Sequence, residues 1–330
     1  MKERKIELSI YLFYLLIIVL ITLITFSLVL LLKNQKIDDN NRYQAKSQSK
    51  YQFISPLLDC SDQRSLDLNV NTLKGRLEKL IEESRSSNKV NHVSVYFRDL
   101  NNGPWLGYNE KEKFSPASLM KVPLLMAYLK LAQTDDGILT KKLTAISFDS
   151  LADQNIEPEI KIEVGKEYEV EDLLERMIIY SDNAAAQTLL SYNKIIENEL
   201  DFIYRDLGFN LLSWSDEGYE NYMTVKEYSS FFRILYNSSY LSREMSERAL
   251  KLLSQTDYTF GLKAGVDEKT VVSHKFGERI IFDTKQLHDC GIVYKQEKPY
   301  LLCLMTRGDD LEKMKEVIRD ISQLFYSYLD

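Results

Sequence analysis

Apolar and polar positions follow different patterns in three parts of the chain. Residues 8–32 hold no charged residue, and about 20 apolar residues are enough to cross a bilayer as a helix. The residues that follow are mostly polar and show no hydrophobic period, which is typical of a flexible tether. We therefore expect a short cytoplasmic N-terminus at residues 1–7, a transmembrane anchor at 8–32, a tether at 33–60 and a folded domain at 61–330.

A cleaved signal peptide is the alternative interpretation of the apolar stretch. The stretch is long for the apolar core of a signal peptide, and no small-x-small cleavage site follows it directly, which favours an uncleaved anchor. Basic residues stand on both sides of it, with Lys2, Arg4 and Lys5 before it and Lys33 and Lys36 after it. The distribution of positive charge therefore does not decide the orientation.

Strand-like and helix-like patterns alternate within the folded part. Alternation of apolar and polar residues predicts strands at 92–99, 105–108, 270–276, 290–294 and 300–306. Helical spacing predicts a helix at 66–84, a mostly helical middle from Ser118 to Leu252, and a closing helix from Leu311 that Asp309 and Asp310 cap. This order predicts an antiparallel sheet covered by the terminal helices, with a helical insertion between its strands.

Composition and charge exclude several classes of function. The formal net charge is −7 and no basic patch stands out, so nucleic acid is not an expected partner. His92, His274 and His288 do not lie at metal-ligand spacing and no C-x-x-C occurs. We therefore expect neither a metal site nor a cofactor.

The chain has three cysteines, Cys60, Cys290 and Cys303, so at most one disulfide can form. The predicted C-terminal hairpin places Cys290 nearly opposite Cys303, but disulfides between directly paired strand neighbours are usually strained. A bridge between Cys60 and Cys290 is the second possibility, and three free thiols are the third.

Ser118 and Lys121 are the first candidate catalytic pair. An almost wholly apolar run follows them, which predicts a buried helix beginning near Ser118. Residues three apart share a face of a helix, so the Lys121 amine can reach the Ser118 hydroxyl. A serine hydroxyl needs a base to act as nucleophile, and a buried lysine can have its pKa lowered enough to serve.

The S-x-x-K spacing alone is a weak signal, because Ser47/Lys50 and Ser86/Lys89 match it as well. Those two pairs fall in the tether and beside a helix end, where solvent surrounds both. Only Ser118 heads a buried helix.

A second cluster, Ser181-Asp182-Asn183, lies between two predicted helices. It has two interpretations. In the structural one, it caps the helix that follows. In the functional one, Ser181 passes a proton to a leaving nitrogen while Asn183 holds a substrate amide and Lys121.

A third cluster, His274-Lys275-Phe276-Gly277, lies on a predicted strand. Lys275 offers a cation for a substrate carboxylate, and Gly277 leaves room for a substrate backbone at the strand edge. Lys263-Ala264-Gly265 has a similar form but falls in a loop.

Together and in this order, the three clusters resemble the S-x-x-K, S-D-N and K-T-G set of the class A β-lactamases and D,D-peptidase-like penicillin-binding proteins. The resemblance spans about residues 66–329. It implies an α/β (α+β) fold of the β-lactamase/transpeptidase type. In that fold, terminal helices flank a five-stranded antiparallel sheet (about 61–117 and 255–330) beside an all-helical subdomain (about 118–254).

The same resemblance implies a role for each motif residue. The implied roles are nucleophile for Ser118, base for Lys121, proton shuttle for Ser181, and substrate binding for Asn183, Lys275 and Gly277. It also implies an oxyanion hole formed by the backbone N–H groups of Ser118 and Glu278.

Two departures from the family pattern bear on activity. Phe276 stands where the family usually has a threonine, whose hydroxyl helps to bind a substrate carboxylate. The family also carries a long loop in which a glutamate, followed four residues later by an asparagine, positions the water that deacylates the enzyme. Glu217 and Asn221 have that spacing, and Glu220 is a second acid, but the segment 208–224 is shorter than the family loop.

Three functions follow as alternatives. The first is a β-lactamase and the second is a cell-wall D,D-peptidase, or slowly deacylating penicillin-binding protein, acting on D-Ala-D-Ala peptides. The third is a domain that binds cell-wall fragments or drugs without catalysis. The presence of every motif residue except the threonine favours the two enzymes. Both imply a monomeric catalytic domain on the extracytoplasmic face of the plasma membrane.

Overall fold

The computed structural model describes residues 20–22, 25, 51–55, 70–101, 104–147, 156, 160–192, 194–209, 221–281 and 284–329. The chain forms two compact units, residues 1–52 and 53–330, and the second contains the fold below. Of the predicted anchor, only Leu20–Thr22 and Thr25 are described, so the anchor and its orientation stay predictions. Within the described ranges, no helix is both long enough and apolar enough to span a membrane.

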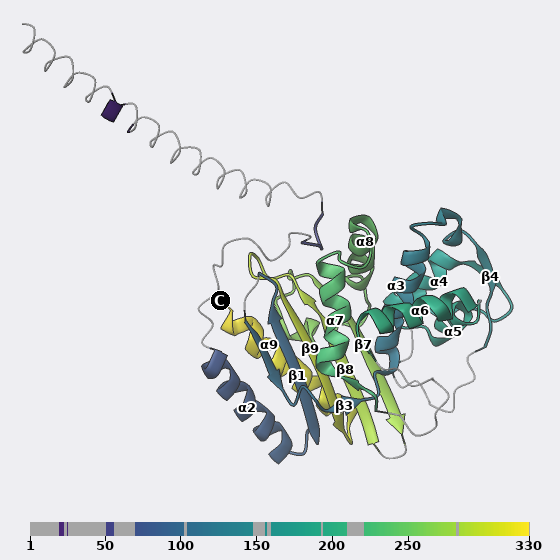
Figure 1. Ribbon diagram of the computed structural model, residues 1–330. Coiled ribbons are helices and arrows are strands. Elements are labelled where there is room, and N and C mark those ends of the chain that lie inside the picture. Colours follow the sequence, from purple (N-terminus) through teal and green to yellow (C-terminus); the bar gives the residue numbers. More distant parts are fainter. Residues whose placement is uncertain are drawn as a thin grey trace, which may run out of the picture. The chain divides into compact units, whose positions relative to one another are not determined.

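A five-stranded antiparallel sheet forms the centre of the second unit (Figure 1). Its strands are β1 (His92–Asp99), β2 (Trp105–Tyr108), β7 (Val272–Ile281), β8 (Thr284–Val293) and β9 (Tyr300–Gly308). They lie in the order β2-β1-β9-β8-β7, so that β7 is an edge strand. The predicted fold class is confirmed.

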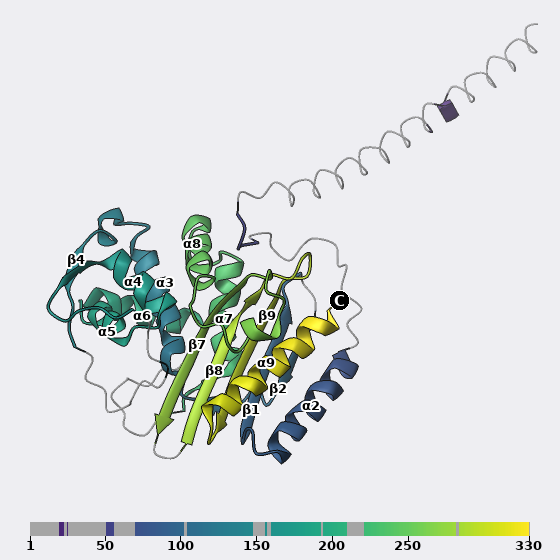
Figure 2. The same ribbon diagram turned by 180° about the vertical axis from the view of Figure 1, so that it is seen from behind.

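Alternation along the central strand explains why helices cover both faces of the sheet. On β9, Tyr300, Leu302 and Leu304 belong to one buried cluster, into which the terminal helices α2 (Val70–Ser86) and α9 (Leu311–Tyr328) pack. Figure 2 shows these two helices side by side on that face. The intervening residues of β9 face the other way, toward α7 (Val225–Tyr236).

The closing helix begins where the sequence predicted. The Asp310 carboxylate accepts hydrogen bonds from the backbone N–H groups of Glu312 at 2.9 Å and Lys313 at 3.2 Å. This side chain therefore satisfies two of the N–H groups that a helix start leaves without a partner.

The middle of the chain is mostly helical, as expected. Its α-helices are α3 (Lys121–Leu131), α4 (Val170–Ile179), α5 (Asn183–Leu190), α6 (Lys194–Asp206), α7 and α8 (Arg243–Leu253). Short 3₁₀ turns occur at η1 (Ala117–Met120), η2 (Asp136–Ile138) and η3 (Lys263–Gly265). Two small sheets were not predicted, β3 (Lys113–Phe114) with β6 (Met223–Thr224), and β4 (Lys142–Thr144) with β5 (Glu167–Glu169).

The β7–β8 hairpin is longer than predicted. The expected strands ended at Phe276 and began again at Cys290, whereas β7 continues to Ile281 and β8 starts at Thr284. Polar residues such as Glu278 and Arg279 interrupt the apolar pattern there, so the sequence looked like a loop.

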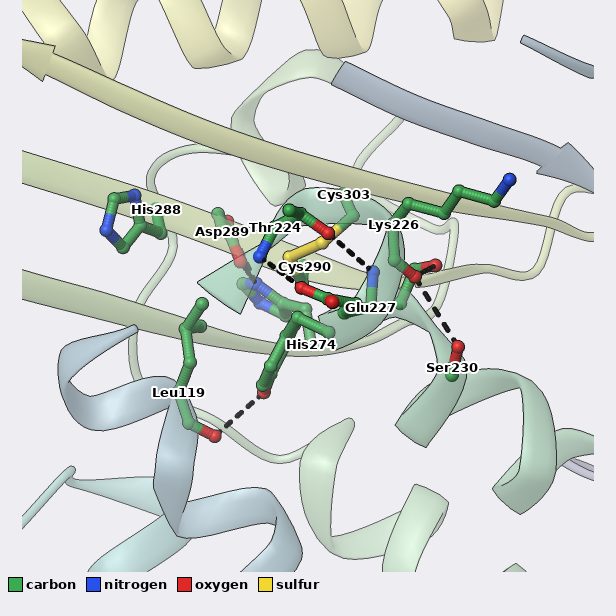
Figure 3. Close-up of a disulfide and its surroundings, with 12 residues drawn as sticks. Leu119, Thr224, Lys226, Glu227, Ser230, His274, His288, Asp289, Cys290 and Cys303 are labelled. Carbon is green, nitrogen blue, oxygen red and sulfur yellow. Dashed lines mark hydrogen bonds and ion pairs between the residues drawn. A yellow bond between two sulfur atoms is a disulfide. The ribbon is translucent and has the colours of Figure 1, made fainter. Parts of the chain in front are cut away.

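A disulfide joins Cys290 on β8 to Cys303 on β9 (Figure 3). The two residues face each other directly in the register, with their Cα atoms 4.0 Å apart. Such closeness is typical of the non-hydrogen-bonded pairs of an antiparallel ladder. The expected alternative bridge from Cys60 to Cys290 is therefore wrong, because Cys290 already has a partner. Cys60 itself lies outside the described residues.

Candidate active site

Ser118 and Lys121 lie at the junction of the 3₁₀ turn η1 and helix α3. The backbone N–H of Lys121 donates to the carbonyl oxygen of Ser118, and side chains three apart are eclipsed in a 3₁₀ turn. Ala117, directly before the serine, has a φ of +50°, an uncommon conformation for a residue with a Cβ. Because α3 begins only at Lys121, Pro123 falls in its first turn, where the missing N–H costs little.

The second cluster joins α4 to α5 and contains the predicted helix cap. Ser181 has a φ of +56°, which turns the chain between the two helices. Asp182 then caps α5, because its carboxylate accepts from Ala185 N at 3.0 Å and from Ile162 N at 2.9 Å. The structural interpretation therefore applies to Asp182, which leaves its neighbours Ser181 and Asn183 to face Lys121.

The Lys121 ammonium group reaches across to this cluster. Its Nζ lies 2.6 Å from the carbonyl oxygen of Ser181, 3.1 Å from Ser181 Oγ and 2.6 Å from Asn183 Oδ1. The structure contains no hydrogen bond from Lys121 Nζ to Ser118 Oγ among the described residues. Catalytic hydrogen bonds are often long without substrate and tighten in the complex, so the one-turn separation remains compatible with proton transfer.

Lys275 approaches Ser181 from β7. Its Nζ lies 2.9 Å from Ser181 Oγ and 3.1 Å from the carbonyl oxygen of Phe276. The Ser181 hydroxyl therefore accepts hydrogen bonds from both lysines, which leaves its own proton available for donation to a third group.

Burial sets the protonation of the two lysines. It lowers the pKa of Lys121 well below its usual range, and the nearby Lys275 ammonium lowers it further. Burial also lowers the pKa of Lys275 to about 7, against the opposing attraction of the Asp289 carboxylate. Lys121 can therefore lose its proton far more readily than an exposed lysine, which a general base requires.

Gly277 brings β7 close to the turn that carries the serine. A Cβ at this position would lie 2.8 Å from the carbonyl oxygen of Pro116 and 3.1 Å from the backbone nitrogen of Leu119. The glycine was expected to make room for a substrate. The structure shows that it makes room for the segment of the nucleophile, and its role toward a substrate stays a prediction.

Phe276 packs into the protein where the family places a threonine. The side chain is buried, and its ring stacks on Tyr258 with the centroids 4.1 Å apart and an interplanar angle of 20°. Lys275 Nζ also lies 4.1 Å from the centre of the Phe276 ring. Phe276 is therefore part of an aromatic stack and offers no hydroxyl to a substrate carboxylate.

Phe276→Thr is expected to lower the free energy of unfolding by roughly 3 kcal/mol, because removing a buried ring leaves a cavity against Tyr258. Urea denaturation of the variant and the wild type measures the difference. Phe276→Leu, which keeps apolar bulk, is the matched control and should lose less. A loss below about 1 kcal/mol, the scale of a typical substitution, would show that the stack contributes little.

Of the acidic residues named from the sequence, the structure describes Glu278 but not Glu217 or Glu220. Glu278 follows Gly277 on β7, and its carboxylate accepts a hydrogen bond from Ile156 N at 2.6 Å. Glu217 and Glu220 lie outside the described residues, so their roles stay predictions. Asn221, the proposed partner of Glu217, accepts a hydrogen bond from Gln286 Nε2 on β8 at 2.8 Å.

Sequence reasoning missed Arg279 and Ser115 beside the site. Arg279 Nη1 donates to Ser115 Oγ at 3.2 Å. Gln286 Oε1 and His288 Nε2 hold the backbone of Ser115 at 3.1 Å and 2.8 Å, respectively. The usable signal was the spacing of Lys275, Gly277 and Arg279, which puts all three on one face of a strand. It was overlooked because the strand was predicted to end at Phe276.

Solved structures of PBP-A and of β-lactamases share this fold. A variant of PBP-A in an acyl-enzyme complex with penicillin G is 21% identical with a TM-score of 0.64, and the match covers 78% of this chain and 96% of that chain. The TLA-3 extended-spectrum β-lactamase is 18% identical with a TM-score of 0.67, covering 79% and 99%. A β-lactamase from Chitinophaga pinensis DSM 2588 is 19% identical with a TM-score of 0.66, covering 79% and 100%.

The sequence itself matches a family of enzymes. The family model described as the beta-lactamase enzyme family aligns with residues 72–329, which include all three motifs and the whole sheet. This protein therefore belongs to the beta-lactamase enzyme family.

Proposed function

We propose that this protein is a serine hydrolase that opens β-lactams, or the related D-Ala-D-Ala peptides, through an acyl-enzyme on Ser118. The observation that carries the proposal is the placement of Lys121. It is a buried amine of lowered pKa, one turn from Ser118 and hydrogen-bonded to Ser181 and Asn183. Groups whose pKa is strongly shifted by burial and by a neighbouring charge are concentrated at functional sites.

Acylation follows from these groups in two proton movements. Lys121 takes the proton of the Ser118 hydroxyl as the serine oxygen attacks the carbonyl carbon. The backbone N–H groups of Ser118 and Glu278 stabilise the negative charge on the carbonyl oxygen. When the C–N bond breaks, Ser181 Oγ donates its proton to the leaving nitrogen and recovers one from Lys121 or Lys275, both of which contact it.

The choice between the two substrate classes rests on deacylation. Water must attack the ester with the help of a base, and the candidate Glu217 lies on a segment that is short for the family. Among the neighbours, a variant of PBP-A is described in an acyl-enzyme complex with penicillin G, and TLA-3 as an extended-spectrum β-lactamase. The missing threonine hydroxyl at Phe276 also favours a substrate other than common penicillins. We therefore propose slow deacylation, as in a penicillin-binding protein.

A chromogenic cephalosporin mixed with the full chain is expected to give a burst of about one equivalent of product, followed by slow turnover. Absorbance measures the burst and intact-mass spectrometry measures the adduct, which should persist for minutes or longer. The burst is expected because acylation uses the Ser118–Lys121 pair, whereas the candidate base for deacylation, Glu217, belongs to a segment that is shorter than the family loop.

Two results would contradict this proposal in different ways. Rapid steady turnover without a burst, lost in Glu217→Ala, would make the protein an efficient β-lactamase. Absence of any adduct would remove the β-lactam substrate class altogether. Glu220→Ala serves as the matched control for Glu217→Ala.

We also propose that the catalytic domain lies on the extracytoplasmic side of the plasma membrane, held by residues 8–32. The Cys290–Cys303 disulfide supports this placement, because disulfides form and persist mainly in oxidising compartments. The cell-wall chemistry proposed above requires the same location.

A further inference from the structure

Arg279 lies on the same face of β7 as Lys275 and Gly277, one alternate position farther along the strand. Lys275 contacts Ser181, Gly277 abuts the turn of the nucleophile, and Arg279 contacts Ser115, three residues before Ser118. The three positions thus follow the length of the active site in order. Figure 1 shows β7 at the side of the sheet that faces the helical part.

The direction of a bound substrate along β7 follows from these contacts. Its leaving nitrogen must lie near Ser181, which supplies the proton, and this fixes the leaving half at the Lys275 end. The reacting carbonyl lies at Ser118 and the N–H of Glu278. The acyl half must then continue toward Arg279, roughly 7 Å beyond Gly277 at the rise of an antiparallel strand.

The Arg279 guanidinium has unused hydrogen-bonding capacity. Its single hydrogen bond within the described part of the chain goes to the neutral Ser115 hydroxyl, and Nε is buried there without a partner. No carboxylate of the described residues forms an ion pair with it. The neighbouring Glu278 points to the other face of the strand and accepts from Ile156 N. A partly buried guanidinium with five donors normally meets an anion.

Tyr222 lies near this guanidinium, because its backbone N–H donates to the carbonyl oxygen of Phe114 at 3.2 Å, directly before Ser115, which Arg279 contacts. Burial raises the pKa of the Tyr222 hydroxyl to about 12, although the Arg279 charge opposes the shift. The hydroxyl therefore stays protonated at neutral pH and can donate a hydrogen bond. Arg279 and Tyr222 together present donors of the kind that bind a carboxylate.

We propose that Arg279, with Tyr222, binds a carboxylate on the acyl half of the substrate. This inference rests on the proposed acyl-enzyme function and specifies its substrate class as acyl donors with an anionic side chain. The subsite differs from the one that Lys275 offers, because it lies on the opposite side of the reacting carbonyl.

Two penicillins provide a matched pair of probes. Carbenicillin and benzylpenicillin share the penicillin nucleus and the phenyl group, and they differ only in a carboxylate on the benzylic carbon of the acyl side chain. The readout is the ratio of their second-order rate constants for acylation of the full chain, measured by competition with a fluorescent penicillin. A general loss of activity cancels in this ratio.

Arg279→Gln is expected to lower the carbenicillin-to-benzylpenicillin ratio at least about tenfold, the effect of losing one charge-assisted hydrogen bond. Arg279→Lys keeps the charge, so its carbenicillin-to-benzylpenicillin ratio should stay within about threefold of the wild-type ratio. A threefold change corresponds to less than half of the free energy of a tenfold change. Arg307→Gln is the matched control. Gln286 on β8 is opposite Arg279 on one side and opposite Arg307 on the other, so the two arginines lie at the same level of the sheet. Arg307 forms an ion pair with Glu112 at 3.3 Å, so its replacement should not change the ratio.

The possible failures are distinguishable. An unchanged ratio in Arg279→Gln, with both penicillins still acylating Ser118, would overturn the subsite and leave the proposed function intact. If neither penicillin acylates the wild type, the proposed reaction with β-lactams fails and the subsite fails with it. If Arg279→Gln does not fold, as shown by loss of benzylpenicillin labelling, Arg279→Met replaces it as the neutral variant, with the same expected ratio.

Discussion

Replacing Ser118 with alanine is expected to abolish covalent labelling of the protein by a fluorescent penicillin. In the proposed mechanism the hydroxyl oxygen of Ser118 forms the ester bond, and alanine has no hydroxyl to replace it. Lys121 and Lys275 are both turned toward Ser181 and are placed to move protons. Gel fluorescence after denaturation measures the label, because only a covalent adduct survives that step.

Two other serines provide matched controls. Ser47 and Ser86 share the S-x-x-K spacing with Ser118, and Ser86 Oγ donates to Glu82 O on the exposed side of α2 at 2.8 Å. Ser47→Ala and Ser86→Ala should therefore label as the wild type does. Labelling that survives in Ser118→Ala would show that the nucleophile is a residue other than Ser118.

Lys121→Arg is expected to slow acylation of Ser118 by about 10²–10⁴-fold, the range for loss of a general base. Arginine keeps the positive charge and the hydrogen bonds toward Ser181 and Asn183, but it does not lose its proton in a protein. Rapid-quench labelling with a fluorescent penicillin gives the rate constant. The comparison thus separates proton transfer from charge.

Lys130→Arg is the control for this variant. Lys130 is on the same helix, and its Nζ donates to Tyr240 O at 2.9 Å, away from the site. It should acylate at the wild-type rate. A Lys121→Arg variant that acylates within about threefold of the wild type, far below the 10²-fold minimum for a general base, would assign the base to another group, with Lys275 as the first candidate.

The first two strands were predicted from the sequence with their observed bounds, 92–99 and 105–108. Local alternation and a nearby turn signal are sufficient for a short hairpin. The β7–β8 hairpin was predicted poorly, because its outer half is polar near the active site. In the proposed function a substrate contacts that edge, and the polar residues that this contact requires interrupt the apolar alternation by which a strand is predicted.

The candidate site was predicted as a set of residues, together with one of its internal contacts, that between Asn183 and Lys121. Ser118, Lys121, Ser181, Asn183 and Lys275 were all named from motifs, and the structure brings them together. The hydrogen bonds from Lys121 to Ser181 were not predicted, because they depend on the φ of Ser181 and on the residue at which α3 begins. Tertiary packing determines such details, and the periodicity of a sequence carries no information about them. For the same reason, Pro123 and the Cys290–Cys303 bridge could be interpreted only in three dimensions.

Burial of Lys275 has a thermodynamic consequence for the whole fold. Its pKa is about 7 in the folded protein and 10.5 for a lysine in solvent, so between these values the unfolded chain binds more protons than the folded one. The free energy of unfolding must then rise with pH across this interval. The destabilisation by buried Lys275 is largest below pH 7, where the amine is protonated in both states. Lys121, shifted in the same direction, adds to the effect. The amines that prepare the site for catalysis thus oppose folding at neutral pH, and the apolar packing on both faces of the sheet must offset them.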